Sequence, residues 1–332
     1  MESLITQIRN KRRVAWIFLT VILASYATPL VQELDDVEPF ADYYYGVLLN
    51  YITCNPTQLD KINIHQNAFL RYWFNCFSEK VLGNDRVVPF AFSIGLVYLV
   101  YLLGHYITKD RIIGLISSTA FSINPLLTMY DTSPTYDQIW AFFVILSVVL
   151  LYKKPFLTPL VYPLAIASKI LAISYLPVFV YTILSEPIKH KKLTLGLLVL
   201  VITIGIITVM ALGPEYKLGF HPERLGVAVL QLLIHLTVLL PILGIFALFL
   251  VMFKAKTKII GTRIVYVWMI WILLTTLMIF VFSGHMQYSY RYVPFAAFMS
   301  VFIGISIVNF GNKVVEMLPR SKTHESEGLA VE

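Results

Sequence analysis

A cluster of carboxylates follows the first long apolar stretch of this chain. Glu33, Asp35, Asp36 and Glu38 lie within a few positions of one another, and aromatic residues follow from Phe40 onward. A carboxylate beside an acceptor hydroxyl can remove its proton as a general base. Aromatic side chains at a membrane face favour the interface between water and lipid. The pattern predicts chemistry on a lipid-borne substrate, with Asp36, Asp35 and Glu38 as the candidate catalytic residues.

Several basic residues on the same predicted side of the membrane are candidates for binding a ligand. Lys169 separates two short apolar stretches, and an unpaired cation at depth costs about 2.5–3.5 kcal/mol on insertion scales. A ligand, a partner or snorkelling of the side chain to the surface would each remove that cost. Arg291 stands between Tyr290 and Tyr292, either as a ligand-binding group or as a lipid-headgroup anchor in an aromatic belt. Two more residues bind a ligand or are structural groups: Arg71 and Arg86.

Metal binding is an open alternative at the acid cluster, which either holds a divalent ion or supplies the base directly. His65 would join the acids as a ligand, but no second histidine stands at ligand spacing. No other cofactor is predicted. Asp137 opens a predicted span, where the helix dipole alone favours an acid. Cys54 and Cys76 fall in one predicted outer loop, where they form a disulfide if that side is oxidising, or pack as free thiols.

The composition indicates an integral membrane protein. Hydrophobic residues make up 58 % of the 332 residues and charged residues 14 %, which leaves almost nothing for a soluble domain. The net charge of +7 follows the membrane topology, so no nucleic-acid partner is predicted. The absence of a Walker A motif and of a dinucleotide fingerprint argues against an ATP-driven pump and a Rossmann-type nucleotide-sugar enzyme. We expect an all-α polytopic membrane protein of about ten transmembrane helices.

The predicted spans define a topology with both termini in the cytoplasm. They are roughly residues 14–32, 88–107, 112–130, 138–152, 155–168, 170–185, 193–213, 225–253, 264–283 and 292–310. With the N-terminus inside, most of the 26 basic residues lie on the cytoplasmic side, as the positive-inside rule requires. Division of the apolar run at Lys169 keeps the lysines near position 190 inside. The membrane is the cell membrane or the endoplasmic reticulum, and the polar tail 313–332 is predicted to be disordered.

The outer segment 32–87 is the one large region between predicted spans. Pro39 suits the first turn of a helix over residues 40–52. A second helix is predicted over residues 65–82, ending at Gly83, with a stripe of apolar residues at helical spacing (Phe69, Trp73, Phe77 and Val81). We expect two interfacial helices lying on the bilayer, the alternative being ordinary packing on the span bundle.

Short motifs along the chain occur in an order and spacing typical of a known family. The outer segment contains Asp36-Val37-Glu38-Pro39-Phe40, His65-Gln66-Asn67-Ala68-Phe69-Leu70-Arg71-Tyr72-Trp73 and Gly83-Asn84-Asp85-Arg86-Val87-Val88-Pro89. Asn124-Pro125-Leu126 with Asp137, Ala167-Ser168-Lys169 and Tyr290-Arg291-Tyr292-Val293-Pro294 follow. On these residues the chain resembles the GT-C glycosyltransferases, in the branch of the protein O-mannosyltransferases and the bacterial lipid A aminoarabinose transferase. The likeness is good over residues 14–185.

The resemblance implies an enzyme that transfers a sugar, with inversion, from a polyprenyl-phosphate donor to a protein, lipid or glycan acceptor on the non-cytoplasmic face. A lipid phosphate leaves without a proton, whereas a glycosidase must protonate its leaving group. One base therefore suffices: Asp36, with Asp35 and Glu38 as alternatives. The implied donor-phosphate partners are Lys169, Arg291, Arg86 and Arg71. Residues 1–185 would form the catalytic part and residues 186–312 additional transmembrane helices.

Two other classes of function stay open. Transporters and lipid flippases contain broken spans, and the pair 155–168 and 170–185 has that form. A non-catalytic membrane scaffold or subunit would keep the fold without using the acids. Replacement of Asp36 by Asn separates these classes, because a transferase loses activity and a scaffold still assembles.

Overall fold

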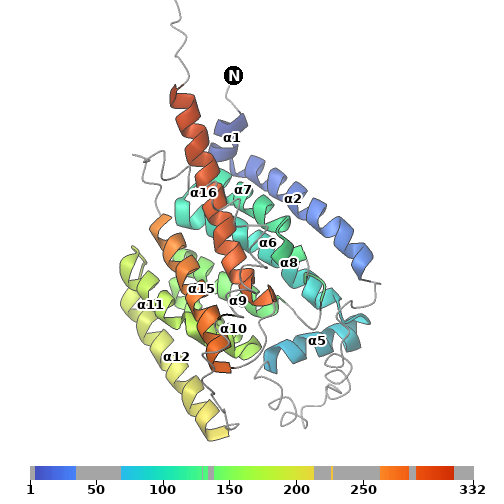
Figure 1. Ribbon diagram of the computed structural model, residues 1–332, viewed down its shortest axis with the longest axis vertical. Coiled ribbons are helices and arrows are strands. Elements are labelled where there is room, and N and C mark those ends of the chain that lie inside the picture. Colours follow the sequence, from blue (N-terminus) through green and yellow to red (C-terminus); the bar gives the residue numbers. More distant parts are fainter. Residues whose placement is uncertain are drawn as a thin grey trace, which may run out of the picture.

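The computed structural model describes residues 4–34, 69–128, 130–133, 138–212, 226, 262–283 and 289–317. Within these ranges every regular element is a helix (Figure 1). The α-helices are α1 (Leu4–Asn10), α2 (Arg12–Glu33), α5 (Phe69–Leu82), α6 (Val87–Thr108), α7 (Arg111–Ser122), α8 (Pro125–Thr128), α9 (Ile139–Lys153), α10 (Thr158–Ser168), α11 (Leu176–Ser185), α12 (Lys191–Leu212), α15 (Thr262–Ser283) and α16 (Val293–Met317). Three short 3₁₀ helices are η2 (Pro155–Leu157), η3 (Ile170–Tyr175) and η5 (Ser289–Tyr292).

Three described helices are long and apolar enough to cross a membrane, over Arg12–Glu33, Val87–Thr108 and Val293–Asn312. A bilayer core of about 30 Å needs roughly 20 apolar residues in a helix. Shorter apolar helices surround these three, over Ile139–Lys153, Pro155–Ser168, Leu171–Ser185 and Thr262–Met278. The described part of the chain is therefore all-helical, and three of its helices could span a membrane.

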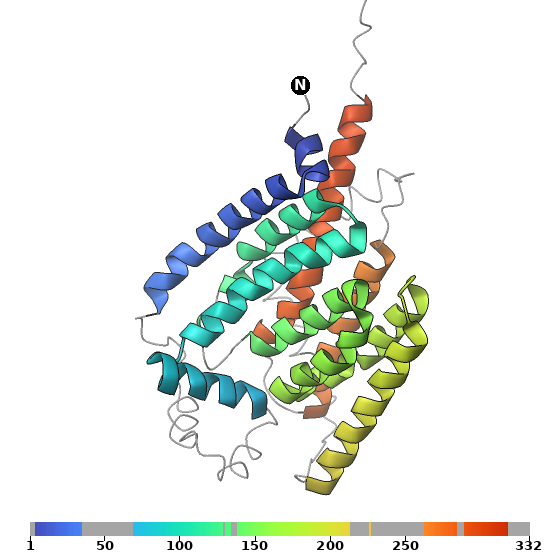
Figure 2. The same cartoon turned by 180° about the vertical axis from the view of Figure 1, so that it is seen from behind.

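The helices pack as two groups that meet at α9 and α16. In the first group α7 lies between α6 and α16, and α2 packs on α6 and α7. In the second group α10 packs on α9 and α12, and α15 packs on α11 and α16 (Figure 2). Aromatic side chains join the groups: the Trp268 ring stacks on Phe298 of α16 at 4.8 Å and meets Phe179 of α11 edge-on at 4.8 Å.

Close backbone contact fixes α6, α7 and α16 against one another. A Cβ atom at Gly304 would lie 2.6 Å from Ser117 Oγ and 2.8 Å from the Ile113 carbonyl oxygen, and one at Gly114 would lie 2.6 Å from the Tyr101 carbonyl oxygen. Gly104 faces Gly114 across the same contact. Small residues let helices approach in lipid, where no hydrophobic driving force brings them together.

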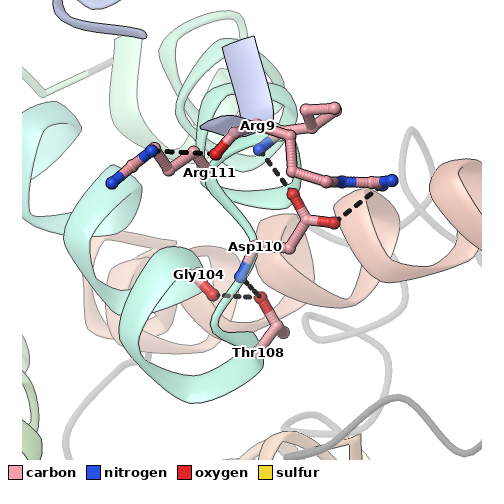
Figure 3. A network of polar contacts seen from close by, with 6 residues as sticks. Arg9, Gly104, Thr108, Asp110 and Arg111 are labelled. Atoms are coloured by element: carbon pink, nitrogen blue, oxygen red, sulfur yellow. Dashed lines mark hydrogen bonds and ion pairs between the residues drawn. The ribbon is translucent and has the colours of Figure 1, made fainter. Parts of the chain in front are cut away.

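Both described ends of the chain lie at one end of the bundle, and α5 lies at the other (Figure 1). We call these the α1 end and the α5 end. At the α1 end, Asp110 accepts the Ile112 amide hydrogen bond at the start of α7 (2.9 Å) and pairs with Arg9 of α1 (2.9 Å). Arg111 donates to the Arg9 carbonyl oxygen (2.8 Å) (Figure 3). One carboxylate thus caps α7 and attaches α1 to the α6–α7 turn.

One predicted span differs from the structure. Residues 112–130 do not form a continuous helix: α7 ends at Ser122 and the four-residue α8 starts at Pro125. The Asn124 carboxamide oxygen accepts the Leu126 amide (2.9 Å). Proline has no amide hydrogen and disfavours helical geometry in the residue before it, which explains the break.

The predicted division at Lys169 is present, since α10 ends at Ser168 and the Lys169 backbone is extended. The predicted span 225–253 lies outside the described residues, apart from Gly226.

Helix α5 presents one apolar stripe outward, and on its other side Phe74 packs on Phe92 of α6 and Phe143 of α9. Trp73, Phe77 and Val81 are 38 %, 49 % and 65 % exposed, while Arg71 and Ser78 are buried. The helix crosses the ends of α6 and α10 (Figure 2), and Gly83 ends it in the left-handed region (φ 74°). Of the helix predicted over residues 65–82, the structure describes Phe69–Leu82 as helical. The predicted helix over residues 40–52 lies outside the described residues.

Candidate functional site

A buried carboxylate, Asp131, lies at the α5 end between α8 and α9. Its Oδ2 accepts a hydrogen bond from the Tyr26 hydroxyl of α2 (3.2 Å), and its carbonyl oxygen accepts one from Ser93 of α6 (2.7 Å). The residue is 1 % exposed. Burial, and the nearby Glu33 carboxylate, raise the pKa of Asp131 to about 7, because both disfavour the charged form. A carboxyl group that titrates near neutral pH can donate or accept a proton under working conditions.

Arg86 fixes the end of α2 beside this carboxylate. Its Nη1 donates to the Glu33 carbonyl oxygen (3.1 Å) and to Thr132 Oγ1 (3.3 Å), and the Thr132 hydroxyl donates to Glu33 Oε2 (3.2 Å). The Asn84 side chain also donates to the Leu34 carbonyl oxygen (2.9 Å). The chain therefore leaves α2 from a fixed position, and Asp35 and Asp36 are the next residues in sequence.

One buried cation lies over the first of two neighbouring aromatic rings, and the charge of a second buried cation acts on the other ring. Lys169 Nζ lies 5.8 Å from the centroid of the Trp140 ring, and the Trp140 and Tyr175 rings lie 6.3 Å apart. Arg291 interacts electrostatically with the Tyr175 side chain. Lys169 and Arg291 are 8 % and 7 % exposed. We call this group, Lys169, Trp140, Tyr175 and Arg291, the cation–aromatic cluster.

Local structure explains how the cluster forms. Lys169 stands at the extended break between α10 and η3, where the Tyr162 hydroxyl donates to the Ala172 carbonyl oxygen (2.5 Å) and closes the turn. The indole of Trp271 on α15 donates to the Ser174 carbonyl oxygen (2.8 Å), next to Tyr175. Arg291 belongs to η5, directly before α16. Both cations therefore lie at junctions between helices, Lys169 between α10 and η3 and Arg291 in the turn before α16.

The cluster has unused hydrogen-bonding capacity. Within the described part of the chain, neither Trp140 Nε1 nor Arg291 Nε has a hydrogen-bond partner, although both atoms are buried. Leaving a buried donor unsatisfied costs about 1–3 kcal/mol, and more for a charged group. Buried cations in a membrane protein usually bind a partner or a substrate. An anionic ligand with several acceptor oxygens would satisfy both requirements.

The structure places some of the predicted site residues and leaves others outside its range. Lys169 lies over the Trp140 ring, and the charge of Arg291 acts on the neighbouring Tyr175. Arg86 instead joins the Asp131 group, and Arg71 is buried on α5. Tyr292 is buried at the end of η5, and the Tyr290 backbone lies in the same 3₁₀ turn. The remaining predicted residues lie outside the described residues: Asp35, Asp36, Glu38, His65 and Asp137.

Sequence reasoning missed Asp131 and its partner Tyr26. An acid in a turn after a span is usually solvated, and no local pattern distinguishes this one from a surface residue. Its burial comes from contacts with α2 and α6, far away in sequence. The motif Tyr130-Asp131-Thr132-Ser133, polar residues beside an apolar stretch, was the only available signal.

An apolar groove runs along α7, between α2 and α16. It has a volume of about 660 Å³ and is lined by side chains of α2, α7 and α16, with Ile8 at the α1 end and Asn124 and Pro125 at the α5 end. Its lining is almost wholly apolar, as expected of a surface that faces hydrocarbon chains. The short helix α8 packs on η5, so the α5 end of the groove lies near the segment that carries Arg291.

Cys76 of α5 is disulfide-bonded. The chain contains two cysteines, and the other, Cys54, lies outside the described residues. Disulfides persist in oxidising compartments. No group of three or more His, Cys, Asp or Glu side chains that could hold a metal ion occurs within the described ranges, which exclude most of the predicted acid cluster and His65.

The chain matches no protein-family model, no curated protein and no solved structure with which it was compared.

Proposed function

We propose that this protein is a membrane glycosyltransferase that moves a sugar from a polyprenyl-phosphate donor to a hydroxyl acceptor. The active site would lie at the α5 end, on the non-cytoplasmic face, with the exposed apolar stripe of α5 resting in the membrane interface. The main support for this proposal is the cation–aromatic cluster. Lys169 and Arg291 were both expected to bind phosphate, and both interact with the same aromatic pair although they are far apart in sequence, Lys169 with the Trp140 ring and Arg291 electrostatically with Tyr175.

The proposed step needs a base and a means of stabilising a phosphate. A carboxylate takes the proton of the acceptor hydroxyl, whose oxygen forms a bond to the anomeric carbon of the sugar. The bond from that carbon to the phosphate oxygen breaks on the opposite face, which inverts the configuration. The lipid phosphate leaves with the bonding electrons, and the two cations stabilise its charge in a site of low polarity.

Asp36 is the base in this proposal, with Asp35 and Glu38 as alternatives. The hydrogen bonds from Arg86 and Asn84 to the last turn of α2 support it, because they fix the chain directly before these acids. The Asp131 group is close to that fixed point, and its carboxyl could relay the proton away from the site. Whether these acids hold a divalent ion or act directly as the base is a separate question for experiment.

Transfer of label from polyprenyl-phosphate sugars tests the proposal. Purified membranes are supplied with a panel of radiolabelled donors and with wild-type protein, Asp36→Asn, Lys169→Met or Arg291→Met. Loss of one preorganised charged group should lower the rate about 10²–10³-fold. Lys80→Met is the matched control, because that lysine is exposed on α5 and should keep full transfer.

Three outcomes are informative. Label moving only with intact Asp36, Lys169 and Arg291 would support the transferase and name the sugar. Full transfer by Asp36→Asn, with Asp35 and Glu38 intact, would show that Asp36 is not the base. No transfer from any donor by well-folded protein would favour a scaffold, or a transporter of the same class of lipid.

A further inference from the structure

We infer that Gln138 is a further ligand-binding residue and that its side chain binds the glycosyl phosphate of the donor. This inference rests on the proposed function, because it extends the cation–aromatic cluster to the start of α9. The amide nitrogen of Gln138 would donate to a phosphate oxygen. The amide oxygen would accept from a sugar hydroxyl. A glycosyl phosphate is the class of ligand that supplies both groups side by side.

The Gln138 side chain is fully buried, and no described residue forms a hydrogen bond with it. It is 0 % exposed, and within the described residues neither its Nε2 nor its Oε1 has a partner. A primary amide can make up to four hydrogen bonds, and burying it without any is costly. A structural glutamine at this depth would be bonded to the chain. A residue that hydrogen-bonds a ligand has no hydrogen-bond partner for its side chain in the ligand-free protein, as is the case for Gln138 among the described residues.

The position of Gln138 favours an anionic ligand. It is the N-cap residue of α9, and its side chain makes no capping hydrogen bond to the first turn. The N-terminus of a helix of this length carries a partial positive charge and binds phosphate groups. Two residues on, Trp140 has a buried indole nitrogen with no hydrogen-bond partner among the described residues, and the Lys169 ammonium lies 5.8 Å from its ring. Gln138 and Trp140 thus both stand in the first turn of α9, and Lys169 lies over the Trp140 ring.

A binding role and a structural role predict opposite effects of Gln138→Leu on stability. Leucine has a similar volume and no polar atoms, so it removes an unsatisfied buried amide. The free protein should then become more stable, and its Tm should rise by about 2–4 °C. If Gln138 instead held the fold through hydrogen bonds, the same variant would melt at a lower temperature.

A matched control exists on α16. Asn309 is also buried, and its Oδ1 has no hydrogen-bond partner among the described residues, but it lies toward the α1 end. Asn309→Leu makes the same kind of chemical change away from the proposed site. It should leave ligand binding unchanged.

The experiment measures binding by calorimetry on full-length protein in detergent, together with thermal unfolding. The probes are farnesyl phosphate mannose, farnesyl phosphate, farnesol and inorganic phosphate. Gln138→Leu should weaken farnesyl phosphate mannose about 10-fold or more and farnesyl phosphate by a smaller factor, with farnesol unaffected. The inorganic phosphate arm shows whether the site recognises a lipid-linked phosphate or any free phosphate.

Unchanged affinity of Gln138→Leu for every probe, with weakened binding by Lys169→Met, would overturn the role of Gln138 and leave the phosphate site intact. A lower Tm for Gln138→Leu, or no binding of any probe by the wild type, would also overturn it. Binding that depends on Gln138, in protein that transfers no sugar, would contradict the proposed function alone.

Discussion

The Tyr26 hydroxyl on α2 donates a hydrogen bond to the Asp131 carboxylate between α8 and α9, with 3.2 Å between the two oxygens. The contact joins the first long helix to a turn more than a hundred positions away. Arg86 and Thr132 extend it to the Glu33 backbone and side chain. This buried network therefore fixes the end of α2, directly before the acidic segment. It includes Asp131, whose pKa is raised.

Asp131→Asn should change how stability depends on pH. The pKa of Asp131 is raised to about 7 from an ordinary value of 3.8, so the folded protein binds this proton more tightly than the unfolded chain. This more tightly bound proton contributes on the order of 2–4 kcal/mol to the stability of the folded protein. The contribution is fully present below about pH 4 and is lost as the pH rises to about 7. Asparagine resembles the protonated acid and does not titrate. The advantage of Asp131→Asn over wild type in thermal unfolding should therefore grow from pH 4 to 7 and then stay constant. Parallel curves would contradict the raised pKa.

Arg86→Met should destabilise the protein by about 2–4 kcal/mol, because it removes two hydrogen bonds from a buried guanidinium and leaves the Glu33 carbonyl oxygen without that donor. Thermal unfolding in detergent measures the loss. Lys80→Met, at an exposed site on α5, is the control and should stay within about 0.5 kcal/mol of wild type. Equal stability of the two variants would mean that the Arg86 network does not hold the end of α2.

Two glycines of α16 should respond in opposite ways to alanine. A Cβ at Gly304 would press on Ser117 Oγ and on the Ile113 backbone of α7, whereas one at Gly311 would meet no atom within 4 Å. Gly304→Ala should cost about 1–3 kcal/mol through overpacking. Gly311→Ala should gain about 0.5–1 kcal/mol from helix propensity. Unfolding of both variants under the same conditions gives the comparison, and a neutral Gly304→Ala would show that α7 and α16 pack less closely.

Thiol labelling should find no free cysteine in the denatured, unreduced protein. Cys76 is disulfide-bonded, and Cys54 is the chain's other cysteine. Cys76→Ser should release one reactive thiol and, for a bond within one chain, destabilise the protein by about 2–5 kcal/mol. A labelled thiol in the unreduced wild type would contradict the bond.

Local sequence patterns predicted the helices well and the site only in part. Lys153, Lys154 and Lys169 interrupt the apolar runs, and the structure has helix ends at these positions. Gly83 ends α5 as expected. These helix ends were predictable because residues at the ends themselves determine them. The break before Pro125 was missed although its signal is local too, since the apolar run hid it. Asp131 and Gln138 were missed for another reason. Their burial depends on distant helices, and a single sequence does not carry that information.

The glycine contact in the middle of the bundle has a consequence for its α5 end. From Gly304 to Arg291 is about 20 Å along the helix axis, and at Gly304 there is no room for one added methyl group between α16 and Ile113 of α7. A shift of α16 by one helical turn would move Arg291 by about 5.4 Å relative to Tyr175, on which its charge acts. The close packing of α16 on α7 therefore helps to set the position of Arg291 in the cation–aromatic cluster.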